Sequence, residues 1–243
     1  METTIVFAPH PDDEVLGCGG TIALKRKYNC KVLIVYMTNG ENGKLEKFKP
    51  EFLGKMRQKE AILSSQKLMV SESNIFFLGF KDGKLSDDYI KALIKIKKIL
   101  NYYKPQQIFI PFENDGHPDH TETNRIVINA LKSVNFSFTV FEYPLWIWLQ
   151  YPWIRETSIK QFVKKFIKSN ISNSNFNLIK NLNTYVDIST TINKKSSALR
   201  CHESQLNRNN FSNINSLYDV GNGEFLSYFL KKQEFFHKKR SFL

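Results

Sequence analysis

The sequence has few cysteines and no long hydrophobic run. The first feature argues against a disulfide-stabilised protein, and the second argues against a membrane helix. Cys18, Cys30 and Cys201 are its only cysteines and show no C-x-x-C spacing. They cannot all pair within one chain, so we expect buried free thiols in a reducing compartment. The most apolar segment, 145–154, is interrupted by Pro152 and falls short of the roughly 18 apolar residues of a membrane helix. The first residues lack a secretory signal, so a cytoplasmic protein is expected.

Composition and charge limit the possible partners. Apolar residues make up 42% of the 243 residues, which is enough for a packed core and fits one α/β domain. The formal net charge is +12, but the lysines are spread over the predicted helices. This distribution indicates that the lysines lie on solvent-exposed faces of the helices, and it argues against nucleic-acid binding. The alternative is attraction toward an anionic partner, such as lipid headgroups in a peripheral membrane contact or a phosphate-bearing substrate.

The first half of the chain alternates short apolar runs with segments of helical periodicity. The predicted strands are 4–8, 31–37, 74–78, 107–111 and 137–142, and the predicted helices are 13–28, 50–69, 87–103 and about 121–132. Alternation of this kind predicts an α/β fold with a mainly parallel sheet and helices on both faces.

The second half is less regular, and we expect one domain over residues 1–243 with a variable insertion at about 144–183. The further predictions are a strand at 185–188, a helix at 189–205 capped by Ser189 or Thr190, a polar loop at 210–222 and a final helix at 224–238. The region of the insertion contains the aromatic residues Trp146, Trp148, Tyr151 and Trp153. Packing in the core or between subunits is favoured for them; stacking on sugars and contact with a membrane interface are the alternatives.

Two polar motifs follow two predicted strands and contain three of the five histidines. The first has His10, Asp12 and Asp13, and the second has His117 and His120. Because the carboxyl ends of parallel strands lie along one edge of a sheet, the motifs can converge there. Imidazole and carboxylate suit Zn²⁺ or a related divalent ion. A catalytic zinc typically has three protein ligands, so two of the five candidates remain for a base and an oxyanion-stabilising donor.

A purely structural interpretation is available for each motif. His-Pro-Asp suits an ordinary turn, in which the aspartate caps a helix and the proline sets its first turn. Two copies, each after a predicted strand and each with an additional residue of a ligand type, favour a site that binds a metal ion.

These motifs resemble the LmbE-like (PIG-L) family of zinc-dependent N-deacetylases. The similarity is carried by Pro9-His10-Pro11-Asp12-Asp13-Glu14 with a following Gly-Gly-Thr, and by Gly116-His117-Pro118-Asp119-His120. Weaker similarities lie at 38–43, Arg57, Glu60, 78–83, Lys195, 197–199, His202, Ser204 and Gln205. The resemblance implies a Rossmann-like three-layer sandwich that removes the acetyl group from an N-acetylglucosamine-type amino sugar in a glycoconjugate or small metabolite.

The resemblance also implies a role for each residue of the two motifs. His10, Asp13 and His120 would bind Zn²⁺, or another divalent metal such as Fe²⁺. Asp12 would be the general base that activates a metal-bound water. His117 would stay off the metal and would polarise the amide carbonyl or stabilise the oxyanion.

Other positions have weaker assignments. Arg57 and Asp82 match positions that bind sugar hydroxyls in relatives, and a guanidinium–carboxylate pair suits a diol; the alternative for each is a surface or capping charge. His202 and Gln205 are interpreted as structural. Glu14 has two open interpretations, an outer partner of a metal ligand and a charge that complements the helix dipole.

Two other functions remain open. An amidase that cleaves a larger acyl group or a thiol-conjugated amide could use the same scaffold. A non-catalytic protein that docks its basic surface on nucleic acid or membrane is the second alternative, although that role would not require Asp12 and His117 together.

Overall fold

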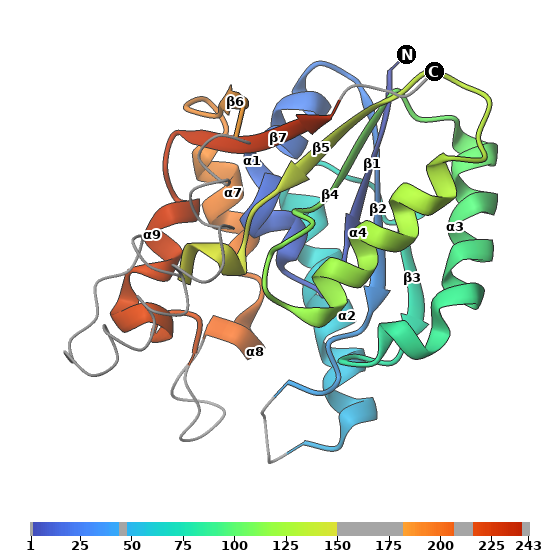
Figure 1. Ribbon diagram of the computed structural model, residues 1–243. Coiled ribbons are helices and arrows are strands. Elements are labelled where there is room, and N and C mark those ends of the chain that lie inside the picture. Colours follow the sequence, from blue (N-terminus) through green and yellow to red (C-terminus); the bar gives the residue numbers. More distant parts are fainter. Residues whose placement is uncertain (1, 44–47, 150–181, 207–215, 240–243) are drawn as a thin grey trace, which may run out of the picture.

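The computed structural model describes residues 2–43, 48–149, 182–206 and 216–239. Its strands form one sheet with the order β3-β2-β1-β4-β5-β7-β6 (Figure 1). The strands are β1 (Thr3–Ala8), β2 (Lys31–Thr38), β3 (Ile75–Phe80), β4 (Gln107–Pro111), β5 (Thr139–Tyr143), β6 (Thr184–Asp187) and β7 (Gln233–Lys239). β1 to β5 are parallel, whereas β7 runs antiparallel to β5 and β6. The prediction of a mainly parallel sheet is therefore confirmed.

The longer helices cover both faces of this sheet (Figure 1). The helices are α1 (Asp13–Lys27), α2 (Pro50–Lys67), α3 (Tyr89–Tyr103), α4 (Pro118–Leu131), α7 (Ile192–Leu199), α8 (Glu203–Leu206) and α9 (Phe225–Phe229), with 3-10 turns η1 (Glu72–Asn74), η2 (Leu85–Asp88), η3 (Trp146–Leu149) and η4 (Val220–Gly223). α1, α2 and α7 pack together on one face, and α3 packs with α4 on the other. The fold is thus the expected three-layer α/β sandwich.

The central strand β1 shows why both faces need cover. Val6 and Ala8 belong to the core shared with α1 and α2, whereas Ile5 and Phe7 belong to the core shared with α3 and α4. All four side chains are fully buried. A strand buried on both faces needs a continuous apolar run, and the sequence supplies one there.

Helix α1 is interrupted at Cys18, whose φ of −148° is not helical. The interruption leaves backbone groups without their usual partners inside the helix. The carboxylate of Glu234 accepts hydrogen bonds from the amides of Gly20 and Thr21, each at 2.8 Å, and from the ammonium of Lys195 at 2.7 Å. The Lys195 and Glu234 side chains are almost inaccessible to solvent. This buried pair therefore ties α1 to α7 and β7.

Removing the Lys195 ammonium should destabilise the fold. Lys195→Met leaves the Glu234 carboxylate buried without its cation, and breaking a buried pair in this way typically costs about 3–5 kcal/mol. Urea unfolding would measure the loss. The control is Lys91→Met, which removes an exposed ion pair with Asp88 and should leave the free energy of unfolding almost unchanged. A Lys195→Met protein as stable as the wild type would contradict this account of α1.

The prediction of a final helix at 224–238 is wrong, because only α9 is helical and the chain then forms β7. Along β7, Glu234 and Phe236 are buried, while their neighbours Gln233 and Phe235 are exposed. This alternation has the period of a strand. This segment has a local pattern that favours a helix. The contacts of Glu234 with α1 and the pairing of the segment with β5 and β6 outweigh that preference, so it forms a strand.

The helix predicted at 189–205 is shorter and is divided into α7 and α8. Its capping position is occupied by Thr191, which follows the two predicted caps. At the start of α8, Glu60 of α2 accepts hydrogen bonds from the amide and hydroxyl of Ser204, at 2.7 and 2.6 Å. The glutamate supplies the partner that a continuous helix would have given the Ser204 amide.

Some predictions fall outside the described residues. They include most of the insertion expected at about 144–183, with Tyr151 and Trp153, and much of the loop expected at 210–222. The three cysteines are free thiols, as expected, but only Cys18 is buried, whereas Cys30 and Cys201 are partly exposed. In the described parts of the chain, no helix has the length and apolar character needed to cross a bilayer.

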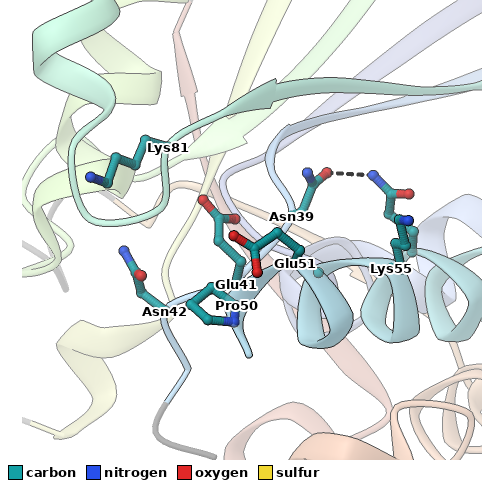
Figure 2. A pocket seen from close by; sticks show the side chains of 9 residues that line it. Asn39, Glu41, Asn42, Pro50, Glu51, Lys55 and Lys81 are labelled. Carbon is teal, nitrogen blue, oxygen red and sulfur yellow. Dashed lines mark hydrogen bonds between the residues drawn. The ribbon is translucent and has the colours of Figure 1, made fainter. Parts of the chain in front are cut away.

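The site suggested by the sequence lies at the edge where the parallel strands end. β1 is flanked by β2 on one side and by β4 on the other, and ligands of open α/β sheets bind at such a switch point. A polar cleft of about 640 Å³ opens at this edge, between the segment after β2, the start of α2 and the turn after β3 (Figure 2). It is lined by Asn39, Glu41, Asn42, Pro50, Glu51, Gly54, Lys55, Gln58 and Lys81.

Candidate active site

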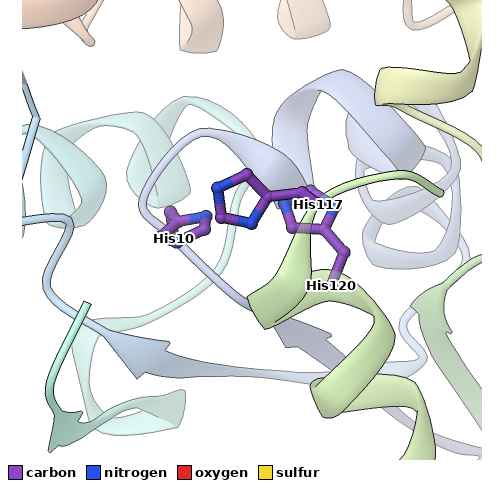
Figure 3. A group of neighbouring side chains, drawn as sticks. All are labelled: His10, His117 and His120. Atoms are coloured by element: carbon purple, nitrogen blue, oxygen red, sulfur yellow. The ribbon is translucent and has the colours of Figure 1, made fainter. Parts of the chain in front are cut away.

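Three imidazole rings gather where β1 ends and α4 begins (Figure 3). The ring centroids of His10 and His117 are 5.0 Å apart, those of His117 and His120 are 5.0 Å apart, and those of His10 and His120 are 5.5 Å apart. Helix α4 begins at Pro118, earlier than predicted, so His117 caps the helix and His120 lies in its first turn. The two motifs therefore converge, as the parallel sheet predicts.

Asp13 joins the two motifs. Its Oδ2 atom lies 3.2 Å from Nδ1 of His10 and 3.2 Å from Nε2 of His120. Nε2 of His120 is buried, and the contact with Asp13 lacks the geometry of a hydrogen bond, so this nitrogen has no hydrogen-bond partner among the described residues. Two imidazole nitrogens thus face one carboxylate oxygen in a buried space.

Each of these two histidines has a second carboxylate on its other nitrogen. Nδ1 of His120 is 2.7 Å from Oδ2 of Asp115, and Nε2 of His10 is 3.1 Å from Oδ2 of Asp119. Asp115 is fully buried and also accepts hydrogen bonds from the amides of residues 145–147. Carboxylates in this position fix the tautomer and orientation of histidines that bind metals.

Asp115 and Asp119 have no role predicted from the sequence. Their contacts depend on the path of the loop before α4, which no periodic pattern describes. The available signal was the excess of carboxylates in the second motif, because an acidic group that becomes buried needs a partner.

The protonation of His120 and Asp13 follows from these contacts. Burial alone would lower the pKa of His120, but Asp13 and Asp115 outweigh it and raise the pKa to about 9. Burial would raise the pKa of Asp13, but His120 and His10 outweigh it and hold that pKa well below its usual value. The carboxylates of Asp13 and Asp115 thus stabilise the protonated, positively charged form of the His120 imidazole. A divalent cation that displaces a proton from this ring would satisfy the same carboxylates.

The donor atoms fit a divalent metal ion such as Zn²⁺. Two groups of described residues place one donor atom from each member within 4.8 Å of the others, namely His10 with His117 and His120, and His10 with Asp82 and Asp119. Asp13 is in neither group, yet it contacts both His10 and His120. We favour Asp13 as the third ligand because Nδ1 of His117 already accepts a hydrogen bond from the amide of Asp119. The ligand set remains a prediction.

Asp115→Asn should weaken metal binding without removing a proposed ligand. The amide keeps the shape of the carboxylate but loses the charge that faces Nδ1 of His120. Loss of such an outer partner typically costs about 10–100-fold in metal affinity. Competition with a zinc chelator would measure the change, with Asp87→Asn on the exposed surface as the control. Equal affinities of the two variants would contradict the role given to Asp115.

Asp12 lies next to these donors in an unusual backbone conformation. Its φ is 114°, in the left-handed region, which costs a non-glycine residue about 1–3 kcal/mol. Its amide donates a hydrogen bond to Oε2 of Glu14 at 3.1 Å, and its carbonyl accepts from the amides of Val15 and Leu16. Burial raises the pKa of the Asp12 carboxyl well above its usual value, and the neighbouring Asp13 adds to the increase. A carboxyl in this state is suited to take up a proton.

The helix that His117 caps also orients its ring. Nδ1 accepts a hydrogen bond from the amide of Asp119 at 3.2 Å, which places the proton of the neutral ring on Nε2. Burial lowers the pKa of His117 to about 4, and the charges of His10 and His120 add to the effect. The ring is therefore neutral near pH 7 and offers one N–H donor.

The structure brings Asp82 to the histidines and places Arg57 nearby. Oδ1 of Asp82 lies 3.0 Å from Nε2 of His10, and Oδ2 accepts a hydrogen bond from the amide of Asn42 at 2.9 Å. Arg57 is buried, donates to the carbonyl of Gly40 at 2.8 Å, and interacts electrostatically with Asp82. Because Asn42 also lines the polar cleft, Asp82 stands between the histidines and that cleft.

Comparison with known proteins places these features in one family. The family model described as GlcNAc-PI de-N-acetylase (PIG-L) matches residues 5–131, just over half of the chain. A probable N-acetyl-α-D-glucosaminyl L-malate deacetylase of Bacillus subtilis is 33% identical over 54% of this chain and 61% of its own length. A 1D-myo-inositol 2-acetamido-2-deoxy-α-D-glucopyranoside deacetylase of a Mycobacterium species is 24% identical over 81% of this chain and 72% of its own.

A solved structure extends the likeness to the whole fold. The N,N′-diacetylchitobiose deacetylase from Pyrococcus horikoshii aligns with a TM-score of 0.72 and 21% identity, over 98% of this chain and 84% of that one. At this identity the alignment shows that the fold is shared. By contrast, the match to the Bacillus protein spans about three fifths of that relative.

Proposed function

The chain belongs to the PIG-L family, and from this premise we propose that it is a metal-dependent hydrolase that removes the N-acetyl group from an N-acetylglucosamine-type amino sugar. Water cleaves the amide bond, and acetate and a free amine leave as products. The proposed metal is Zn²⁺, with Fe²⁺ as the alternative. His10, Asp13 and His120 are the proposed ligands.

The convergence of two histidines on one carboxylate oxygen carries this proposal. Asp13 lies 3.2 Å from a nitrogen of His10 and 3.2 Å from a nitrogen of His120. The other nitrogen of each histidine faces a buried carboxylate, Asp115 or Asp119. A structural turn has no use for this double arrangement, whereas histidines that bind a metal ion typically have such a partner on their second nitrogen.

Asp12 is the proposed general base. A divalent ion held by the three ligands would polarise the acetyl carbonyl and lower the pKa of a water molecule. Asp12 takes up the proton that water loses when its oxygen attacks the acetyl carbon, and gives it to the amide nitrogen as the C–N bond breaks, so that the free amine can leave. The fixed backbone next to Asp13 keeps the Asp12 carboxylate beside the proposed ligands.

His117 is the proposed oxyanion-stabilising donor. Its Nδ1 is occupied by the amide of Asp119, so the proton of the neutral ring is on Nε2. That N–H can donate to the acetyl oxygen as negative charge develops on it, and a preorganised donor of this kind strengthens as the transition state forms.

The polar groups beside the histidines support a sugar as the substrate. Arg57 and Asp82 are the proposed partners of its hydroxyl groups, because a guanidinium and a carboxylate together can bind a diol. The cleft next to Asp82 is lined by amides, carboxylates and ammonium groups, with Lys81 and Lys55 on opposite sides (Figure 2). Such a lining suits a hydroxylated or charged substituent of the amino sugar.

Acetate release from a panel of substrates tests the proposal. Zinc-loaded protein would be incubated with N-acetylglucosaminyl malate, N,N′-diacetylchitobiose and an N-acyl series in which longer chains replace acetyl. We expect acetate release from an N-acetyl sugar and lower rates with longer acyl groups. Faster cleavage of the longer chains would favour the amidase. No hydrolysis, together with salt-dependent binding to liposomes or DNA, would favour the non-catalytic binding protein.

A further inference from the structure

We propose that His202 and Glu14 form a buried pair that holds Asp12 in place for proton transfer, which makes His202 a positioning residue of the active site. The inference rests on the role proposed above for Asp12. His202 lies between α7 and α8, far from the two motifs in the sequence.

Asp12 needs support because its backbone conformation is strained. The other described non-glycine residues with positive φ are Asn29, Met69 and Lys104. Each of these lies just after a helix, where left-handed residues are common. Asp12 instead precedes a helix, and strain of this kind persists only where surrounding contacts impose it.

Glu14 imposes the conformation directly. Its Oε2 accepts the hydrogen bond of the Asp12 amide at 3.1 Å. Its Oε1 is buried and has no hydrogen-bond partner among the described residues, and the whole side chain is inaccessible to solvent. A buried carboxylate is costly unless a polar or cationic group faces it. Nε2 of His202 lies 3.6 Å from Oε1, and the buried hydroxyl of Tyr36 also interacts with the Glu14 carboxylate.

The burial of His202 is not explained by any hydrogen bond of its ring within the described residues. Its side chain is fully buried, and neither ring nitrogen has a hydrogen-bond partner in the described part of the chain. Buried polar side chains are nearly always satisfied, so an exception requires a specific reason. Its proximity to the Glu14 carboxylate supplies that reason. This replaces the purely structural interpretation that the sequence suggested for His202.

The same segment contacts the loop before α1 a second time. Nε2 of Gln205 donates to the carbonyl of Pro11 at 2.6 Å, one residue before Asp12. Ser204 is held by both oxygens of Glu60, which fixes the segment against α2. The Pro11–Asp12 peptide is therefore held at its carbonyl by Gln205 and at its amide by Glu14, the residue that His202 approaches from the same turn as Gln205.

The test uses the zinc-loaded protein of 243 residues and three variants. His202→Leu removes the imidazole beside Glu14, including two ring nitrogens that have no hydrogen-bond partner in the described part of the chain. If His202 only fills space in the core, this variant should therefore lose little stability. His202→Gln restores a polar donor at the same position. Leu199→Ala is the control, because it opens a cavity at a buried core position of α7 and lowers global stability.

Two measurements are made on each protein. The first is the hydrogen-exchange rate of the Asp12 amide by NMR, which we expect to rise about tenfold or more in His202→Leu and to recover partly in His202→Gln. The second is acetate release from N,N′-diacetylchitobiose. We expect kcat to fall about 10–100-fold in His202→Leu, with KM and zinc content unchanged. Leu199→Ala should keep its kcat.

Unchanged exchange of the Asp12 amide in His202→Leu would overturn the inference, whether or not the protein hydrolyses this substrate. An equal fall of kcat in His202→Leu and Leu199→Ala would overturn it as well. A third outcome is possible, in which the Asp12 amide exchanges faster in His202→Leu but the wild-type protein releases no acetate. This outcome would support the His202–Glu14 pair and would count against the proposed activity on this substrate. The two proposals therefore fail in different ways.

Discussion

Asp12→Asn is expected to lower kcat for acetate release by about a thousandfold while the protein keeps its metal ion. Asparagine has the shape of aspartate and tolerates a positive φ, but it cannot take up a proton. A positioned general base contributes about 10²–10⁴-fold to rate, so the loss should be of this size. Steady-state rates at saturating substrate would be compared with the zinc content of the same samples by mass spectrometry.

The companion variant is Asp87→Asn, in which the same chemical change falls on an exposed residue. Its rate should equal that of the wild type. Wild-type turnover by Asp12→Asn would show that another group accepts the proton. Loss of zinc together with turnover would instead move Asp12 from the base to the ligand set.

His120→Ala is expected to lose its metal ion, whereas His117→Ala is expected to keep it and lose turnover. Removing a ligand should weaken binding by more than the roughly 100-fold upper range for an outer partner. Removing an oxyanion donor should lower kcat by about 10²–10³-fold and leave metal affinity near the wild-type value. Zinc titration against a chelator and steady-state kinetics would be done on both variants.

This pair of variants separates the two interpretations of the three clustered rings. His10, His117 and His120 can bring one donor atom each within 4.8 Å of the others, so a site with three histidine ligands predicts equal loss of zinc in both variants. A full complement of zinc in His120→Ala would remove His120 from the ligand set.

The convergence of the two motifs was predictable from the sequence because the residues of each motif lie close together in the chain and each motif follows an apolar run. His10 and Asp13 come directly after β1, and His117 and His120 come just after β4. A parallel sheet places both strand ends along one edge, and the structure shows that β1 and β4 are neighbours there. The convergence of the motif residues therefore follows from the sequence pattern, whereas Asp82, in the turn after β3, was predicted only from the family resemblance, as a sugar-binding residue.

The partners of the site were harder to predict, because they depend on the path of loops and on contacts between distant segments. Asp115 becomes a partner of His120 only through the loop before α4. His202 approaches Glu14 only because the turn between α7 and α8 is fixed against α2. Local sequence patterns contain neither relation.

The C-terminal strand was missed for a similar reason. Residues 224–238 have a composition compatible with a helix, but Glu234 is required by the interrupted α1 and by Lys195. Satisfying those buried groups places the segment in the sheet as β7. A contact made by one side chain thus overrides the local preference of the chain.

Anomalous X-ray diffraction from crystals of the zinc-loaded protein, recorded at the zinc absorption edge, tests the central claim most directly. The account predicts one strong peak within bonding distance, about 2.0–2.2 Å, of His10, Asp13 and His120, with His117 outside that distance. A peak bound by His10, Asp82 and Asp119, or no peak at this edge of the sheet, would contradict it.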